Sequence, residues 1–269
     1  MNILFISIII FLFGSIVGSF LNVCIHRLPI NESIVSPRSH CPKCKNLITW
    51  YDNIPLFSYL YLKGKCRHCE NNIPFRYFLV ELLNGILYLS IFHLFFPYNI
   101  LLVLSYFIFT SLLIVATFVD FKYFIIPDSI SIGGTVAGLL LSLICPQLMQ
   151  QTAIWPSFLR SFFSGLICSG LLLFIAISAT FFLKKEAMGM GDVKLLAMIG
   201  TFIGWKLGLF SILLASFIGS FVGIALILGK GFKWQSQIPF GPYLSLGALI
   251  SLFFGEKMIN FYLDLLMHP

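Results

Sequence analysis

The segment Gly189-Met190-Gly191-Asp192 places a carboxylate behind two glycines, where one long apolar stretch ends and another begins. An acid beside hydrocarbon is costly, so a carboxylate at such a boundary is a candidate for function. The two glycines permit unusual backbone angles and let another chain approach closely. The same pattern also fits a glycine turn followed by a helix N-cap, so alone it indicates a catalytic acid and a capping residue equally well.

A second carboxylate at the same membrane depth would favour catalysis. Asp120 closes one apolar stretch and Asp192 opens another, and the topology expected below brings both to the inner face. Two like charges at short range cannot both ionise easily, so such a pair shares one proton. One carboxylate can then take a proton from water while the other protonates a peptide carbonyl. The alternative is two unrelated acids that cap helices.

The composition is that of a polytopic membrane protein. Hydrophobic residues make up 59% of the 269 positions and charged residues only 10%, and the mean hydropathy is +0.97. Soluble domains carry about 25% charged residues, so the composition excludes them. We expect an all-α fold with about eight transmembrane helices of roughly 20 residues each. The expected spans are 3–25, 77–96, 100–119, 129–145, 157–183, 192–204 (short for a span), 207–228 and 239–265.

Positive charge is concentrated in the polar loop 26–76, which holds eight of the 17 Lys and Arg residues and three acids. Basic loops beside spans face the cytoplasm, which puts both termini on the outer side of the membrane. The basic loop lacks the aromatic interleaving of a nucleic-acid module. Orientation in the lipid bilayer therefore explains the charge, and we expect no nucleic-acid partner.

Two Cys-x-x-Cys pairs lie in this loop, at Cys41/Cys44 and Cys66/Cys69. Disulfides are rare in the reducing cytoplasm, and four thiolates at this spacing suit a tetrahedral structural Zn²⁺. The loop is therefore expected to be a small cytoplasmic zinc-binding domain without a large apolar core. The remaining cysteines lie in apolar segments, where they are expected to be small core residues: Cys24, Cys145 and Cys168.

Several further motifs occur in a fixed order and together resemble the bacterial type IV prepilin peptidases, membrane aspartyl proteases of the Gly-x-Gly-Asp class. The resemblance covers nearly the whole chain. The matching segments are Phe-Leu-Asn-Val-x-Ile-x-Arg-Leu-Pro in the first span, the cysteine loop, Asn53-Ile-Pro55, Arg76-Tyr77-x-x-Val-Glu81, Asp120-x-Lys-x-x-x-Ile-Pro-Asp128, Gly189-x-Gly-Asp192-x-Lys194 and Pro239-Phe-Gly-Pro242.

The resemblance implies that Asp120 and Asp192 are the catalytic pair and that the protein lies in the bacterial inner membrane. The implied substrates are prepilins and pseudopilins of type IV pili or type II secretion. In this family the cysteine loop marks members that also methylate the new N-terminus with S-adenosylmethionine. The sequence contains no glycine-rich nucleotide fingerprint, so it does not locate a site for the methyl donor.

Other residues have both a functional and a structural explanation. Glu81, an acid inside the second span, is a methyltransferase candidate, and an ion pair with Arg76 or Lys122 explains it equally well. Asp128 is expected to cap a helix, with catalysis as the minor alternative. Lys122 and Lys194 are expected to anchor the inner face, with tuning of the acid pair as the alternative. The backbone-shaping candidates near the aspartates are Gly189, Gly191, Pro239, Gly241 and Pro242; for the last three a plain helix-start turn is the simpler explanation.

The predicted domains are a first helix (1–25), the zinc loop with methyltransferase function (26–76) and a membrane peptidase domain (77–269). A peptidase without methyltransferase activity is the nearest alternative function. A proton-coupled transporter would place its acids near the membrane centre and would show paired broken helices, and the sequence shows no internal repeat. A non-catalytic scaffold of a pilus or secretion machine is the third alternative.

Overall fold

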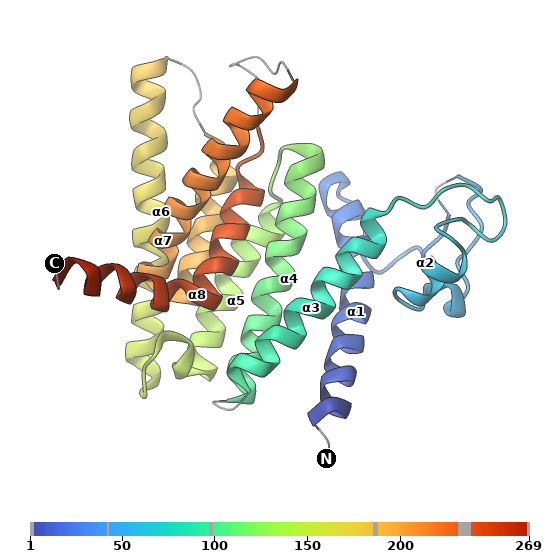
Figure 1. Ribbon diagram of the computed structural model, residues 1–269, viewed down its shortest axis with the longest axis horizontal. Coiled ribbons are helices and arrows are strands. Elements are labelled where there is room, and N and C mark those ends of the chain that lie inside the picture. Colours follow the sequence, from blue (N-terminus) through green and yellow to red (C-terminus); the bar gives the residue numbers. More distant parts are fainter. Residues whose placement is uncertain (1–2, 42, 97–98, 185–187, 231–237, 268–269) are drawn as a thin grey trace. The chain divides into compact units, whose positions relative to one another are not determined.

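The computed structural model describes residues 3–41, 43–96, 99–184, 188–230 and 238–267 (Figure 1). Lys185 and Glu186, and residues 97–98 between two of the expected spans, lie outside these residues. Within them the regular structure is helical, and pairing between extended segments is limited to isolated bridges. The elements are α1 (Ile3–Arg27), η1 (Leu28–Ile30), η2 (Trp50–Asn53), α2 (Phe57–Tyr61), α3 (Arg76–Phe95), α4 (Ile100–Tyr123), α5 (Asp128–Ile144), η3 (Pro146–Met149), α6 (Ile154–Leu183), α7 (Met190–Lys230) and α8 (Gly241–Met267).

The expectation of an all-α membrane protein is confirmed. Six helices in the described residues, α1, α3, α4, α6, α7 and α8, are long and apolar enough to cross a membrane. Because lipid offers no hydrogen-bond partners, a helix is the structure that satisfies the backbone of such segments internally. α5 is apolar but has only 17 residues. The number of eight crossings stays a prediction.

The long segment α7 is a hairpin of two helices rather than one rod. Gly204, with φ +79° and ψ 165°, interrupts the helical backbone. A Cβ added at Gly208 would lie 3.5 Å from the Cα of Gly200, whereas residues eight apart in one helix are separated by about 12 Å. The chain therefore turns back at Gly204, a conformation that glycine adopts without strain. The expected end of the short span 192–204 coincides with this turn.

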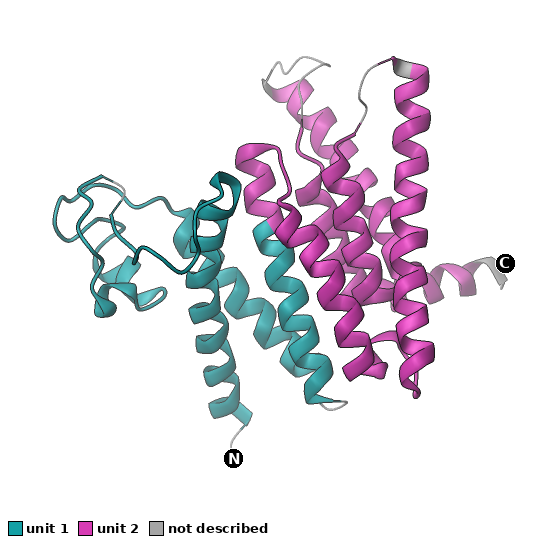
Figure 2. Cartoon of the chain, turned by 180° about the vertical axis from the view of Figure 1, so that it is seen from behind, with its two compact units in different colours: residues 1–115 teal, residues 116–269 magenta. Residues whose placement is uncertain are grey.

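The chain divides into two compact units, Met1–Val115 and Ala116–Pro269 (Figure 2). In the first unit α1 packs against α3 through small residues. Cβ atoms added at Gly14 and Gly18 would lie 2.9 Å and 2.7 Å from the Cα atoms of Gly85 and Glu81. The Asn84 amide donates a 2.7 Å hydrogen bond to the Gly14 carbonyl. Close backbone contact and an interhelical hydrogen bond are typical of packing in membranes.

In the second unit α5, α6 and α8 pack around α7. The contacts again depend on small residues, because a Cβ at Gly200 would lie 2.6 Å from the Ser164 carbonyl oxygen and one at Gly247 2.5 Å from that of Ser211. The Ser161 hydroxyl donates to the Thr201 carbonyl at 2.9 Å. This packing fixes the start of α7 and the start of α8, which carry the residues of the candidate site.

Candidate active site

Asp120 lies in the last turn of α4 and is only 5% exposed. The helix ends at Phe124, whose φ of +56° is left-handed and whose N–H donates to the Asp120 carbonyl at 2.9 Å. The N–H of Gly241 donates a 2.9 Å hydrogen bond to Oδ2 of Asp120. Gly241 begins α8, so its N–H has no carbonyl partner within that helix. The Asp120 carboxylate supplies the missing acceptor, and the hydrogen bond in turn fixes the orientation of the carboxylate.

Asp192 lies in the first turn of α7 and is 9% exposed. Its N–H donates to the Gly189 carbonyl at 3.2 Å. A carboxylate in the first turn of a helix is favourably placed relative to the helix dipole. Asp120 is hydrogen-bonded to the N-terminus of α8 and Asp192 lies at that of α7, so both acids are held at helix starts.

Both carboxylates line one cavity of about 270 Å³ in the second unit. Its remaining lining residues are Phe124, Ile125, Ile126, Asp128, Gly189, Met190, Gly191 and Lys194. The structure thus brings together two acids that are 72 positions apart in the chain. A buried, water-accessible pair of carboxylates is the arrangement that acid/base hydrolysis requires.

Each of the three glycines of this site lies close to one of the two acids or to Ile126. A Cβ on Gly241 would lie 2.7 Å from Oδ2 of Asp120, a Cβ on Gly191 3.2 Å from the Cβ of Ile126, and a Cβ on Gly189 3.7 Å from Oδ2 of Asp192. Gly241 therefore excludes any side chain, Gly191 leaves little room, and Gly189 leaves ordinary contact distance.

Ile126 is a site residue that sequence reasoning missed. It is 8% exposed and packs against both Gly191 and Gly241, which belong to different helices. The signal was present, because Ile126 stands between Asp120 and Asp128 in a motif that carries the resemblance. Because the whole sequence is rich in apolar residues, its pattern did not separate Ile126 from ordinary core residues.

The structure corrects the roles expected of Asp128 and Lys194. Asp128 is the first residue of α5, whose N-cap is Pro127, and no side chain caps this helix. Instead Oδ1 of Asp128 forms an ion pair of 2.6 Å with Nζ of Lys194, and both side chains line the cavity. The lysine is therefore part of the cavity wall rather than only an anchor at the inner face.

The two prolines of the predicted site begin α8. Pro239 precedes the helix and is half-buried, and Pro242 is its second residue and is buried. Proline is well tolerated at this position because an N–H there would have no partner within the helix. Both prolines thus define where α8 starts, and this fixes Gly241 beside Asp120.

The four loop cysteines meet in the first unit, as their spacing predicts. The Sγ atoms of Cys41, Cys44, Cys66 and Cys69 lie within 4.8 Å of one another, and those of Cys41 and Cys69 are 3.8 Å apart. Thiolates bonded to Zn²⁺ at about 2.3 Å form a tetrahedron with edges of about 3.8 Å, so the cluster fits such an ion. The Cys44 N–H lowers the pKa of Cys41 to about 6 against the opposing effect of burial, which favours the metal-binding thiolate.

The cysteine loop contains a short repeat that sequence reasoning did not find. The pattern Cys-x-x-Cys-x-Asn occurs at Cys41 and again 25 residues later at Cys66. In each copy the residue directly after the second cysteine has a left-handed φ angle, +59° at Lys45 and +53° at Glu70. Their N–H groups donate at 2.9 Å to the carbonyls of Cys41 and Cys66 respectively. Two copies of one turn therefore present the four thiols.

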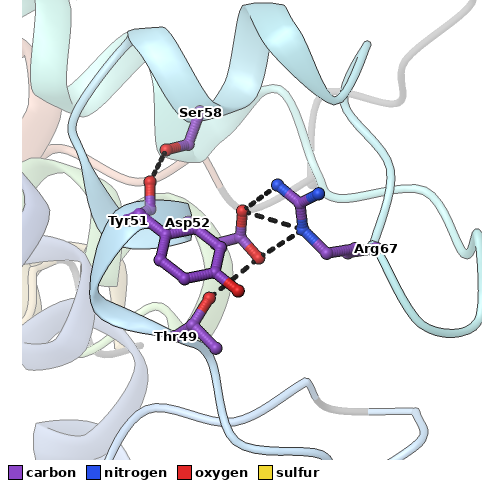
Figure 3. A network of polar contacts seen from close by, with 5 residues as sticks. All are labelled: Thr49, Tyr51, Asp52, Ser58 and Arg67. Carbon is purple, nitrogen blue, oxygen red and sulfur yellow. Dashed lines mark hydrogen bonds and ion pairs between the residues drawn. The ribbon is translucent and has the colours of Figure 1, made fainter.

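Figure 3 shows how the second copy of the turn is tied to η2. Arg67, between the two cysteines of that copy, donates to both carboxylate oxygens of Asp52, with distances of 2.6 to 3.1 Å. The Thr49 hydroxyl donates to the same carboxylate at 3.0 Å. The hydrogen bonds from Arg67 and then from Thr49 hold the pKa of Asp52 below its usual value, although burial opposes them.

Glu81 in α3 is 8% exposed, and its Oε2 accepts a 2.8 Å hydrogen bond from the N–H of Leu56. Leu56 has φ +63° and ψ −51°, and its neighbours close a tight turn in which the Phe57 N–H donates to the Pro55 carbonyl at 2.7 Å. Such a γ-turn is strained for a leucine. Among the described residues of the first unit, no ion pair joins Glu81 to Arg76.

A helical membrane protein with two buried carboxylates at one cavity has the architecture expected of a membrane aspartyl peptidase. The family described as "Bacterial Peptidase A24 N-terminal domain" matches residues 12–95, and the "Type IV leader peptidase family" matches residues 107–224. The chain belongs to this family of leader peptidases.

Several curated relatives match this chain over nearly their whole length. Proteins named "Prepilin leader peptidase/N-methyltransferase" from Aeromonas hydrophila and Bacillus subtilis (strain 168) are 35% and 31% identical to this chain. The matches cover 95% and 96% of this chain and 93% and 98% of the respective relatives. A relative of the same name from Legionella pneumophila is 30% identical over 96% of this chain and 95% of its own. No solved structure matches.

Proposed function

We propose that this chain removes the leader peptide of type IV prepilins and pseudopilins, with Asp120 and Asp192 as the catalytic pair. The observation that carries the proposal is the single cavity lined by both buried carboxylates. Membership of the leader peptidase family and the names of its relatives supply the reaction and the substrate class.

In the proposed mechanism the two carboxylates share one proton. The ionised carboxylate takes a proton from a water molecule as the water oxygen bonds to the scissile carbonyl carbon, and the protonated carboxylate gives its proton to the carbonyl oxygen. The tetrahedral species then collapses as the leaving nitrogen is protonated, and the carbon–nitrogen bond breaks. The hydrogen bond from Gly241 keeps Asp120 oriented throughout this sequence.

Leader cleavage in detergent tests this proposal. Purified Asp120→Asn and Asp192→Asn chains should cleave a synthetic prepilin about 10³-fold more slowly or not at all, because each loses one partner of the acid/base pair. Asp264→Asn makes the same chemical change on an exposed residue of α8 and should leave the rate unchanged. Cleavage at the normal rate by either Asp120→Asn or Asp192→Asn would overturn the proposal.

The metal at the four loop cysteines is proposed to be a structural Zn²⁺. Four thiolates close the coordination shell, so the ion supplies stability to the loop rather than a reactive position. Metal analysis of the purified chain should give one zinc per chain. Replacing Cys41 and Cys66 with serine should remove the zinc and increase proteolysis of loop 26–76, because metal binding is coupled to folding of small domains.

We further propose that the chain methylates the amino group exposed by cleavage, with S-adenosylmethionine as methyl donor. The relatives carry N-methyltransferase in their names. The described residues do not define a recognisable pocket for the donor. Glu81 is assigned a positioning role, because its carboxylate holds the turn at Leu56 that leads into the cysteine loop.

Methyl transfer from labelled S-adenosylmethionine to cleaved product separates this activity from that of a peptidase alone. Label in the product supports the bifunctional enzyme, and cleavage without label leaves only the peptidase.

The proposed location is the bacterial inner membrane, with loop 26–76 in the cytoplasm and both termini in the periplasm. The excess of basic residues in that loop supports this orientation. Residue-specific labelling of intact cells should therefore reach an introduced cysteine near residue 150 and leave one at residue 63 unlabelled. The opposite pattern would reverse the topology.

A further inference from the structure

The last twelve residues of α8, 256–267, form an amphipathic segment. Among the described side chains of this segment, the one polar contact to another element is that of Glu256 with Gln150. Up to Gly255 buried residues recur along α8, but from Glu256 to Leu265 every residue is exposed or half-buried. The exposed side chains include large apolar ones, with Phe261 71% exposed and Leu265 62% exposed. This segment therefore presents an apolar face that no other described residue of the chain covers.

The polar residues of the segment all share one face. Successive residues of an α-helix are turned by about 100°, which places Glu256, Lys257, Asn260 and Asp264 within one arc of about 100°. The rest of the circumference carries the apolar side chains Met258, Ile259, Phe261, Tyr262, Leu263 and Leu265. A helix with one polar face and a broad apolar face containing aromatic residues is typical of segments that lie in the membrane interface.

Most of the membrane crossing of α8 is made before this segment begins. Gly241, at the start of α8, is hydrogen-bonded to Asp120 at the cavity end of the second unit. Glu256 accepts a hydrogen bond from the side-chain amide of Gln150, which follows η3 beyond the far end of α5. Since α5 begins at the cavity with Asp128, α5 and residues 241–255 connect the same two faces of the unit.

The lengths of the two segments agree with this placement. Residues 241–255 span about 22 Å as a helix and the 17 residues of α5 span about 26 Å. Both therefore fall short of a hydrocarbon core of about 30 Å, and residues beyond Gly255 reach the opposite interface. In both views the last turns of α8 run across the direction of α6 rather than along it (Figures 1 and 2).

We propose that residues 256–267 lie on the bilayer surface opposite the cavity, with Phe261 and Leu265 in the lipid and Asp264 toward water. The partner is the lipid surface itself. The segment carries two acids and one lysine in its first nine residues, so burial of apolar side chains rather than attraction to anionic lipid holds it there. Such an anchor fixes the depth of α8 in the membrane.

Fluorescence quenching of the full chain in phosphatidylcholine nanodiscs tests the proposal. An environment-sensitive fluorescent amino acid replaces either Phe261 or Asp264, with Leu265 and Asn260 as a second pair should one variant express poorly. The probe at position 261 should be quenched about twofold or more better by lipid carrying a nitroxide near the headgroup than by aqueous iodide, and the probe at 264 should show the reverse order.

Four results would overturn it. Strongest quenching of both probes by nitroxides near the chain ends would mean that α8 continues across the membrane. Equal access of iodide to both positions would place the segment in water. Protection of position 261 from lipid and iodide alike would mean that a protein surface covers it. A marked gain of lipid quenching on adding anionic lipid would contradict the absence of an electrostatic contribution.

Discussion

The N–H of Gly241 and Oδ2 of Asp120 are 2.9 Å apart, although 121 positions separate these residues in the chain. This hydrogen bond joins the first residue of α8 to the last turn of α4 at the wall of the cavity. It gives the helix start an acceptor and gives the carboxylate a fixed orientation. The glycine is required there because the carboxylate occupies the space of its missing side chain.

Gly241→Ala should therefore impair leader cleavage. Its Cβ would lie 2.7 Å from Oδ2 of Asp120, so either the carboxylate or the start of α8 must shift. A displacement of about 1 Å in an active site can reduce the rate by about 10²-fold, and we expect a loss of that order. The measurement is the initial rate of cleavage of a synthetic prepilin by purified chain.

Two other glycines provide the matched controls. Gly191→Ala meets Ile126 at 3.2 Å and should give an intermediate loss, whereas Gly170→Ala in α6 has no neighbour within 4 Å and should cleave normally. Equal rates for Gly241→Ala and Gly170→Ala would show that the contact with Asp120 does not matter.

The ion pair between Asp128 and Lys194 should contribute little to stability. The two side chains are 62% and 37% exposed, so water screens their attraction. Exposed pairs contribute about 0.2–1 kcal/mol, and we expect a coupling energy in this range. A double-mutant cycle with Asp128→Ala, Lys194→Ala and the double variant measures it from unfolding in detergent. A coupling of several kcal/mol would mean that the pair is buried in the membrane-embedded protein.

The helices could be predicted from the sequence because lipid imposes a simple rule. A long apolar run must satisfy its own backbone, so its ends fall near the first charged residues or prolines. The break within α7 could be predicted by the same rule, because the apolar run that begins after Asp192 ends at Gly204, before Trp205 and Lys206. Asp120 and Asp192 were proposed as a pair because each stands at such an end.

The contacts that refine the site could not be predicted in this way. Whether Asp128 caps its helix or pairs with Lys194 depends on side-chain positions across two helices. Nor does spacing reveal that Ile126 packs against Gly191 and Gly241 together, because apolar residues are present throughout the chain. The cysteine-loop repeat was overlooked because it contains few residues and none of them forms a regular helix or strand.

Acid should loosen the cysteine loop through the pair of Asp52 with Arg67. The folded pKa of Asp52 is lowered, chiefly by hydrogen bonds from Arg67, so the unfolded loop binds a proton more readily. The contribution of ionised Asp52 to the stability of the loop is fully present above the unfolded pKa of about 3.9. It disappears as the pH falls through the lower pKa of the folded loop. Pulse hydrogen exchange of residues 49–67 between neutral pH and pH of about 3 should show this loss.

Asp52→Asn is the control, because it removes the charge but leaves the cysteines intact. The variant should exchange faster than the parent near neutral pH, and the two should converge below the folded pKa of Asp52. A constant difference at all pH values would show that the titration of Asp52 does not matter. Zinc content is measured in both proteins at each pH, and the comparison uses only the pH values at which both retain the ion, because protonation of the cysteine ligands also loosens the loop.

Glu81 should be required for methylation and dispensable for leader cleavage. Glu81→Leu leaves the Leu56 N–H without its buried acceptor, at a cost of about 1–3 kcal/mol, and releases the strained turn before α2. Glu81→Gln retains a carbonyl oxygen that can accept this hydrogen bond, so it should keep much of the methyl transfer that Glu81→Leu loses. The measurements are label transferred from S-adenosylmethionine and cleavage rate, taken on the same preparation.

The pattern across the two variants decides what Glu81 does. Rescue by glutamine identifies a hydrogen-bond acceptor that positions the turn, whereas equal loss in both variants requires the negative charge itself. Leu56→Gly offers an independent check, because glycine adopts φ +63° without strain and should keep methylation with a more stable loop. Parallel loss of cleavage and methylation in Glu81→Leu would instead show that the residue is needed for the whole protein to fold, since Glu81 also packs in the close contact with Gly18 of α1.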